Sequence, residues 1–163
     1  MKKLLLSIVT AIALMATPVL AATTPNSVVT AQTPKLAVVQ FLQGTDTAGT
    51  YKTLYTGGAN GSKISGMWVT NEDGSAPHLV TCQLVRAAVF YGGVAFLVGT
   101  NLGYSTGLPA ANIMSAALWP GLPVDGNGNP YFYLSANDTI QCTFATSLTS
   151  STYLNVSAVV SDF

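Results

Sequence analysis

The sequence predicts an all-β fold, a single antiparallel β-sandwich with a jelly-roll as its candidate topology. Short runs of β-branched and aromatic residues recur along the chain, and Gly, Asn, Asp and Pro separate them. Three of these runs alternate apolar and polar residues, so that each strand would bury one face and expose the other to water. The 163 residues are enough for one domain with a substantial core and too few for two ordinary domains.

Residues 1–21 are expected to be a secretory signal peptide that is not part of the fold. Lys2 and Lys3 are followed by an apolar run of 13 residues, and Val19 and Ala21 occupy the positions of a small-residue cleavage site. This run is shorter than the ~20 residues that cross a bilayer, although an uncleaved membrane anchor is the alternative. We therefore expect a secreted, extracellular or periplasmic chain with no membrane span after signal cleavage.

Residues 22–34 form the second segment, which is rich in Thr and Pro and has no apolar period. This composition predicts a flexible or extended arm. The segment is either a disordered terminus or an arm, from Thr23 to Pro34, that packs on a neighbouring subunit.

Residues 35–163 are predicted to form the sandwich domain. Its expected strands, in chain order, cover residues 35–42, 50–56, 63–70, 78–90, 94–100, 131–134, 138–146 and 152–160. A turn is expected at residues 91–93, between two of these strands. One short connecting helix is predicted over residues 109–119, because Pro109 stands at its start and Pro-Gly follows its end.

The glycine-rich loop GGANG, residues 57–61, is the first candidate for a ligand site. A phosphate loop needs Gly-Lys-Ser/Thr at the opening of a helix, whereas here GSKISGMWV opens a strand. A hairpin turn explains the glycines directly, because glycine adopts positive φ without steric cost. We therefore predict a turn that joins two paired strands.

The segment DGNGNPY has the alternating oxygen ligands of the first half of a calcium loop, at Asp125, Asn127 and Asn129. Ala136 occupies the position of the bidentate Glu that such a loop requires, and a proline stands where its glycine should be. A tight turn before a strand needs the same residues. The sequence favours the turn and leaves weak calcium binding open.

Side chains suited to catalysis are scarce. His78 is the only histidine, no GxSxG motif is present, and the sole adjacent carboxylates are Glu72 and Asp73 on a predicted turn. A closed zinc site built from His78 and the two cysteines would need a fourth ligand. We therefore expect no catalytic residue, no metal and no cofactor, and His78 is the base that an enzyme would have to use.

The mature chain carries very little charge. Removing Lys2 and Lys3 leaves four basic and six acidic side chains, for a net charge of about −2. No basic cluster is available to bind nucleic acid. Such a chain must build its surface from Thr, Ser, Asn, Gln and Gly, which leaves the edges of a sheet poorly guarded against self-pairing.

Cys82 and Cys142 both lie on the apolar face of their predicted strands. In an oxidising compartment they would form a disulfide between the two sheets. Such a bond would close a loop of about 60 residues and stabilise the fold by roughly 4 kcal/mol in the chain-entropy model. Two buried free thiols are the alternative, because the sequence does not fix the distance that a bridge needs.

Four stretches together carry a resemblance to a known family: KTLYTGGANGSKISGMWVTNEDG, FLVGT, PAANIMSAALWPGLPVDGNGNPYFYLSANDTIQC and VSAVVSDF. Their order resembles small β-sandwich structural proteins of tailed bacteriophages and prophages, described as virion, tail-fibre or decoration-type proteins. The resemblance covers roughly residues 50–163 and implies no catalytic residue. It implies a subunit that packs against copies of itself or against other virion proteins. The secretory signal departs from this family, whose subunits assemble in the cytoplasm.

These observations predict a non-catalytic structural subunit of phage virion type that self-associates and is exported, or that belongs to a virion if a phage encodes it. Its expected partners are copies of itself or other structural proteins, and no nucleic acid. The candidate contacts are the arm from Thr23 to Pro34 and the loop residues Asp125, Asn127 and Asn129. The alternative is a secreted or cell-surface binding module that recognises glycan or protein. Its aromatic platform would be drawn from Tyr51, Tyr55, Tyr104, Trp119 and Tyr131.

Overall fold

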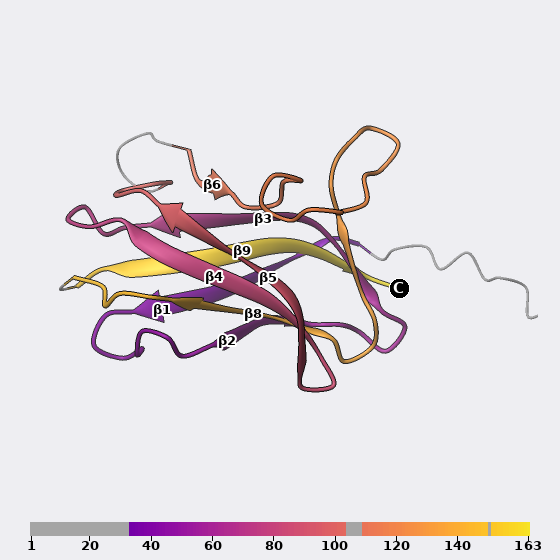
Figure 1. The fold of residues 1–163 in the computed structure, drawn as a ribbon, viewed down its shortest axis with the longest axis horizontal. Helices are drawn as coiled ribbons and strands as arrows, with labels where there is room; N and C mark the ends of the chain where they lie inside the picture. Colours follow the sequence, from indigo (N-terminus) through magenta and orange to yellow (C-terminus); the bar gives the residue numbers. More distant parts are fainter. Residues whose placement is uncertain (1–32, 104–108, 150) are drawn as a thin grey trace, which may run out of the picture.

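The computed structural model describes residues 33–103, 109–149 and 151–163, which fold into two facing antiparallel sheets (Figure 1). The strands are β1 (Lys35–Leu42), β2 (Lys52–Thr56), β3 (Ser62–Asn71), β4 (His78–Arg86), β5 (Val89–Val98), β6 (Ala111–Asn112), β7 (Phe132–Leu134), β8 (Thr139–Phe144) and β9 (Tyr153–Asp162). The five-stranded sheet has the order β1-β9-β3-β6, with β7 also paired to β3. The four-stranded sheet has the order β2-β8-β4-β5. The predicted all-β fold with two antiparallel layers is therefore confirmed.

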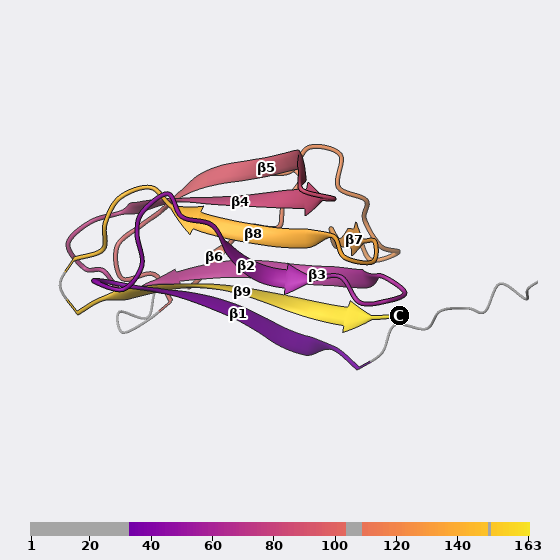
Figure 2. The ribbon, with the colours of Figure 1, turned by 90° about the horizontal axis from the view of Figure 1, so that it is seen from below.

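The core lies between the two sheets, which Figure 2 shows as two layers, with β4, β5 and β8 in one and β1, β3 and β9 in the other. Alternate residues of each strand point into this space. The inward residues of β9 are all fully buried: Leu154, Val156, Ala158 and Val160. Phe41 of β1 packs on Phe144 of β8 with ring centroids 5.1 Å apart, and this aromatic pair joins the two layers.

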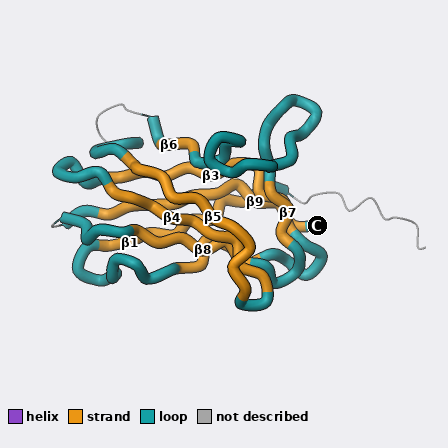
Figure 3. The backbone as a smooth tube through the Cα atoms, in the orientation of Figure 1, coloured by secondary structure: helices purple, strands orange, loops and turns teal. Residues whose placement is uncertain are grey.

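The predicted helix over residues 109–119 is not formed, and no helix occurs in the described parts of the chain (Figure 3). Ala111–Asn112 instead form β6 on the edge of β3, and the Ile113 N–H donates to the Met67 carbonyl at 3.0 Å. A single turn follows, in which the Trp119 N–H donates to the carbonyl four residues earlier at 2.9 Å. Pairing with β3 thus satisfies backbone groups that a helix would have bonded internally.

The GGANG loop is not a hairpin turn, because it connects β2 of the four-stranded sheet to β3 of the five-stranded sheet. Its glycines permit a close approach to the chain that precedes β8. The Gly57 N–H donates to the Asp138 carbonyl at 2.8 Å, and a Cβ on Gly57 would collide with the Ser135 carbonyl oxygen. Gly61 has a positive φ of 93°. The loop therefore crosses between the sheets, and the expected pairing of its two flanking strands was wrong.

The β4–β5 hairpin differs from the sequence prediction in the position of its turn. The predicted strand over residues 78–90 ends at Arg86, and the turn is formed by Ala87 and Ala88, with positive φ angles of 47° and 63°. Two positive φ values define a type I′ turn, which matches the twist of paired strands but usually contains Asn-Gly. The turn expected at residues 91–93 lies inside β5, where a register shift bulges the hairpin.

The predicted signal peptide and most of the predicted arm, including Thr23, lie outside the described residues, as does Tyr104. Pro34 is described and is exposed directly before β1. Within the described ranges, no helix is both long enough and apolar enough to cross a membrane.

Candidate functional site

Strand β5 carries four large apolar side chains that are more than half exposed: Val89 at 58%, Phe90 at 62%, Tyr91 at 61% and Leu97 at 68%. This strand of 10 residues contains no charged residue and no proline. It is the last strand of its sheet, and β4 is its only hydrogen-bonded neighbour in the described chain. We call this open side the β5 edge. Sheets usually blunt such an edge with lysine, proline or a covering loop, so the β5 edge is the candidate interaction surface.

The opposite edge of the sandwich, at β1, is guarded by charged side chains from outside the strand. Lys52 of β2 donates from Nζ to the Gln40 carbonyl at 2.9 Å, which occupies a backbone acceptor of β1. The same ammonium group is 2.5 Å from Asp46. Asp46 also accepts the Leu42 N–H at 2.7 Å, so the end of β1 is bonded to the loop that follows it.

An ion pair holds the turn end of β5 against the rest of the four-stranded sheet. Arg86 donates from Nε and Nη2 to the Asp138 carboxylate at 2.9 and 2.6 Å, a fork geometry that favours arginine. These bonds lower the pKa of Asp138, and the Ser135 N–H bond to the same carboxylate acts in the same direction. The Arg86 guanidinium lies 5.0 Å from the Tyr91 ring centroid, so one cation positions both the turn and an exposed ring.

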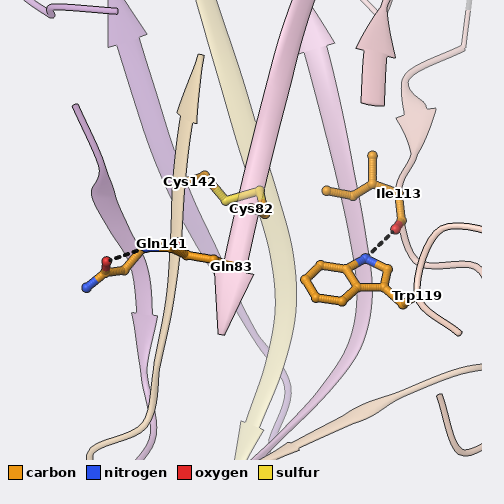
Figure 4. Close-up of a disulfide and its surroundings, with 6 residues drawn as sticks. All are labelled: Cys82, Gln83, Ile113, Trp119, Gln141 and Cys142. Atoms are coloured by element: carbon orange, nitrogen blue, oxygen red, sulfur yellow. Dashed lines mark hydrogen bonds between the residues drawn. A yellow bond between two sulfur atoms is a disulfide. The ribbon is translucent and has the colours of Figure 1, made fainter. Parts of the chain in front are cut away.

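The predicted disulfide between Cys82 and Cys142 is present, but it does not join the two sheets (Figure 4). Cys82 of β4 lies directly opposite Cys142 of β8 in the four-stranded sheet, with Cα atoms 4.1 Å apart. Both residues are fully buried and face the core, as their parity indicated. Parity assigns a face to a residue but does not say which sheet the strand joins, and this is why the inter-sheet placement was wrong.

His78, the only candidate for a catalytic base, is fully enclosed. Its Nε2 lies 2.8 Å from the Asp73 carboxylate and its Nδ1 lies 3.1 Å from the Thr146 hydroxyl, and both side chains of the His78–Asp73 pair are 0% exposed. Although burial raises the pKa of Asp73, hydrogen bonds from His78, Thr149 and Ser75 hold it well below its usual range. The cluster ties the β3–β4 loop and the β8–β9 loop to the start of β4 at one end of the sandwich, and it leaves no ring nitrogen facing a substrate.

The DGNGN segment forms the expected turn, and its carboxylate is occupied by the turn itself. Asp125 accepts the N–H groups of Asn127 and Asn129, each at 2.9 Å, and these bonds lower the pKa of Asp125. Asn127 and Asn129 are exposed, so they are accessible to a partner. No group of three His, Cys, Asp or Glu side chains that could hold a metal ion occurs among the described residues.

The aromatic residues proposed as a platform do not share one environment. Trp119 is only 7% exposed and donates from Nε1 to the Ile113 carbonyl at 3.0 Å (Figure 4). Its ring also packs edge-on against Phe132. Tyr55 uses its hydroxyl to donate to Asp162 at 2.5 Å. Tyr51 lies directly before β2 and is 41% exposed. Trp119 is therefore a core residue, and the proposed platform is not assembled.

Sequence reasoning missed a different aromatic group, formed by Tyr131, Tyr133 and Phe163. Tyr133 is 56% exposed and its ring centroid lies 4.9 Å from that of Tyr131 and 5.7 Å from that of Phe163. The spacing of Tyr131 and Tyr133 in YFYL was the signal for this pair, because residues two apart share a face. A shallow pocket of roughly 210 Å³ lies beside Tyr131, and Lys63, Asn112, Asp125 and Asn129 contribute to its wall.

The described residues form an all-β, disulfide-bonded sandwich, and its β5 edge is a long sheet edge without charge. Neither a scan against models of known protein families nor a search of curated proteins finds a match to this sequence. The function must therefore be inferred from the molecule's own surfaces.

Proposed function

We propose that this chain is a non-catalytic structural subunit that self-associates, with a virion-type domain that is exported. The observation that carries the proposal is the β5 edge, an open strand of 10 residues with no charge and four large exposed apolar side chains. Open edges of this kind are templates for pairing with another chain. The Asp125 turn and the arm before β1 are further candidate contacts, because Asn127, Asn129 and Pro34 are exposed.

The nesting of the strand pairs supports a jelly-roll topology for this subunit. β1 pairs with β9, β2 with β8, β3 with β6 and β4 with β5, so each pair in sequence encloses the next. Jelly-rolls with two antiparallel sheets occur in viral capsid proteins and in lectins. This topology fits the resemblance to phage structural proteins, while the choice between assembly and glycan binding depends on the surfaces.

Two further observations support the proposal. His78 is 0% exposed and is bonded on both ring nitrogens, so the base that an enzyme would need does not face solvent. The Cys82–Cys142 bond fits an oxidising compartment, which supports export through the N-terminal signal. If a phage encodes the chain, a virion is the alternative location.

Self-association is tested by expressing the full precursor in a bacterium and measuring the exported protein by sedimentation and electron microscopy. We expect dimers or larger oligomers whose fraction grows with concentration, because an open edge binds by mass action. A chain that stays monomeric up to millimolar concentration would overturn the proposal. The same preparation, labelled for free thiols, reports whether the exported protein carries the disulfide.

The second candidate function is a secreted or cell-surface module that binds glycan or protein. The pocket of roughly 210 Å³ beside Tyr131 and the exposed Tyr133 favour this alternative, because polar side chains and an aromatic ring are adjacent there. A glycan array probed with the wild-type chain and with Tyr133→Ala tests it. Hits that disappear in the variant would favour binding, and an array without hits would remove this candidate for glycans.

A further inference from the structure

We infer that two copies of this chain pair through their β5 edges, antiparallel and about a two-fold axis at Ala95, so that their four-stranded sheets form one continuous sheet. This inference rests on the proposed self-association and names the surface and the partner. The joined sheet would have the order β2-β8-β4-β5 in one copy, continued by β5-β4-β8-β2 of the second copy.

The Cα spacing of the two disulfide-bonded residues shows which way the backbone N–H and C=O groups of β4 point within the sheet. Cys82 and Cys142 are directly opposed with Cα atoms 4.1 Å apart, which is the short spacing of a non-hydrogen-bonded antiparallel pair. In such a pair the N–H and C=O groups of both residues point away from each other. The backbone groups of Cys82 therefore point to the other side of β4, toward its partner Val94 in β5.

The direction of the backbone N–H and C=O groups alternates from one residue to the next along a strand. The groups of Val94 point toward β4, and so the groups of its neighbours in β5 point away from β4. The N–H and C=O groups of Gly93, Ala95 and Leu97 face the open side of β5. None of these groups bonds to another segment of the described chain. All three residues are exposed, so an incoming strand meets a row of free donors and acceptors.

A second copy satisfies this row with the same groups when the axis passes through Ala95. Ala95 then exchanges both hydrogen bonds with Ala95 of the second copy, and Gly93 pairs with Leu97 of the second copy. Leu97 is 68% exposed, and in this register its side chain lies opposite Gly93 of the second copy, which has no side chain. The same fit repeats on the other side of the axis, because a two-fold contact is self-complementary.

The absence of charge favours a copy of the same chain as the occupant. In a two-fold contact each charged residue near the axis meets its own copy, and like charges placed opposite each other are destabilising. The 10 residues of β5 contain none. Arg86, just before the turn, is 2.6 Å from Asp138 and is thereby neutralised within its own chain.

The test is sedimentation of the exported chain and of Ala95→Lys, which places a like charge at the axis. We expect the dissociation constant of the dimer to rise by at least about 100-fold while the circular dichroism spectrum is unchanged. Val38→Lys is the matched control, because Val38 is 51% exposed on β1, the edge strand of the other sheet. Association retained in Ala95→Lys but lost in Val38→Lys would overturn this inference and leave self-association standing.

Two further measurements separate the remaining outcomes. Deleting residues 22–34 should leave the dimer intact, and loss of the dimer would show that association depends on the arm and would overturn pairing through β5 alone. Spin labels on Thr81, which lies opposite Ala95 on β4, should be about 14 Å apart, since three strand spacings of about 4.8 Å separate them. A dimer without dipolar broadening overturns the pairing, whereas a wild-type chain that is always monomeric overturns the proposed function as well.

Discussion

Two edge strands of the sandwich, β1 in the five-stranded sheet and β5 in the four-stranded sheet, differ in what protects them. β1 has exposed apolar residues of its own, with Leu36 at 60% and Val38 at 51% exposure, but Lys52 of the other sheet bonds its Gln40 carbonyl at 2.9 Å. The β5 edge receives no such side chain in the described structure. An edge strand is therefore guarded or open according to its neighbours across the sandwich, and its own sequence is not enough to decide this.

The edges also differ in how they are attached. β1 pairs along its whole length with the central strand β9, and Lys35 at its start bonds Asp162 at the end of β9 at 2.6 Å. Among the described strands, β5 is hydrogen-bonded to β4 alone, and β4 is joined to β8 by the disulfide. The four predictions that follow test this contrast in order of expected size.

Removing the disulfide should cause the largest change in the free energy of unfolding. The loss of structure should begin in β4 and β5. The bond spans 60 residues of sequence, so Cys82→Ala/Cys142→Ala should lower the free energy of unfolding by about 4 kcal/mol in the chain-entropy model. Hydrogen exchange should show β4 and β5 losing protection before β1 and β9, because the bond joins β4, which carries β5, to β8 and does not touch the sheet of β1 and β9. Equal loss of protection in both sheets would contradict the contrast.

Replacing the β4–β5 turn should have the next largest effect, with the opposite sign. Ala87 and Ala88 hold positive φ angles of 47° and 63°, and each left-handed alanine costs roughly 1–2 kcal/mol. Ala87→Asn/Ala88→Gly supplies the residues that a type I′ turn prefers and should raise the free energy of unfolding by about 1–2 kcal/mol. Thermal unfolding measures the gain. Ala117→Gly, an exposed position without a positive φ, is the control and should give no gain.

Removing the guard of β1 should make this edge resemble the β5 edge. Lys52→Met keeps the aliphatic chain but removes the bonds to Gln40 and Asp46, and should lower the free energy of unfolding by about 1 kcal/mol. It should also create association that Ala95→Lys does not abolish, measurable by light scattering of the double variant. Lys63→Met is the control, because Lys63 lies on β3, between β9 and β7. No new association in the double variant would show that Lys52 is not the guard.

The low charge of the sequence predicted poorly guarded sheet edges, but not which strands would be edges. Strand positions followed well from period-two alternation, because Ile140 and Cys142 in β8 are buried as that pattern required. The order of strands in a sheet depends on long-range pairing, which alternation does not encode. Lys52 as a guard of β1 was therefore not visible before the fold was known.

Local signals also misled where long-range contacts decided the outcome. Gly92 and Gly93 indicated a turn, but Gly93 lies in β5, where a Cβ would come within 2.8 Å of the Cys82 carbonyl oxygen. Ala87-Ala88 carries no turn signal, and its strained conformation is imposed by the pairing around it. One sequence feature could have indicated the buried pair of His78 and Asp73. The two residues are only five apart, and a turn that contains proline lies between them and can bring them together.

The smallest expected effect concerns the acid response of the ion pair at the start of β1. Hydrogen bonds from Lys35, Ser62 and Tyr55 lower the pKa of Asp162 from 3.8 to about 2. A lowered folded-state pKa stabilises the fold above the unfolded value, and this contribution is lost as the pH falls through the folded value. The free energy of unfolding should therefore fall between about pH 4 and about pH 2. Because Lys35 is half exposed, the contribution of Asp162 should be below about 1 kcal/mol.

Denaturant unfolding of the wild type and of Asp162→Asn across this pH range measures the effect. The variant should lose part of the acid dependence, because its amide does not titrate, and it should be slightly less stable at pH 7. Lys35→Met, which changes the partner of Asp162, should also weaken the dependence of the free energy of unfolding on pH. It removes the donor that contributes most to lowering the pKa of Asp162. If the free energy of unfolding of both variants falls with pH as steeply as that of the wild type, then the Lys35–Asp162 pair does not anchor β1. The attachment of this edge would then rest on its pairing with β9 alone.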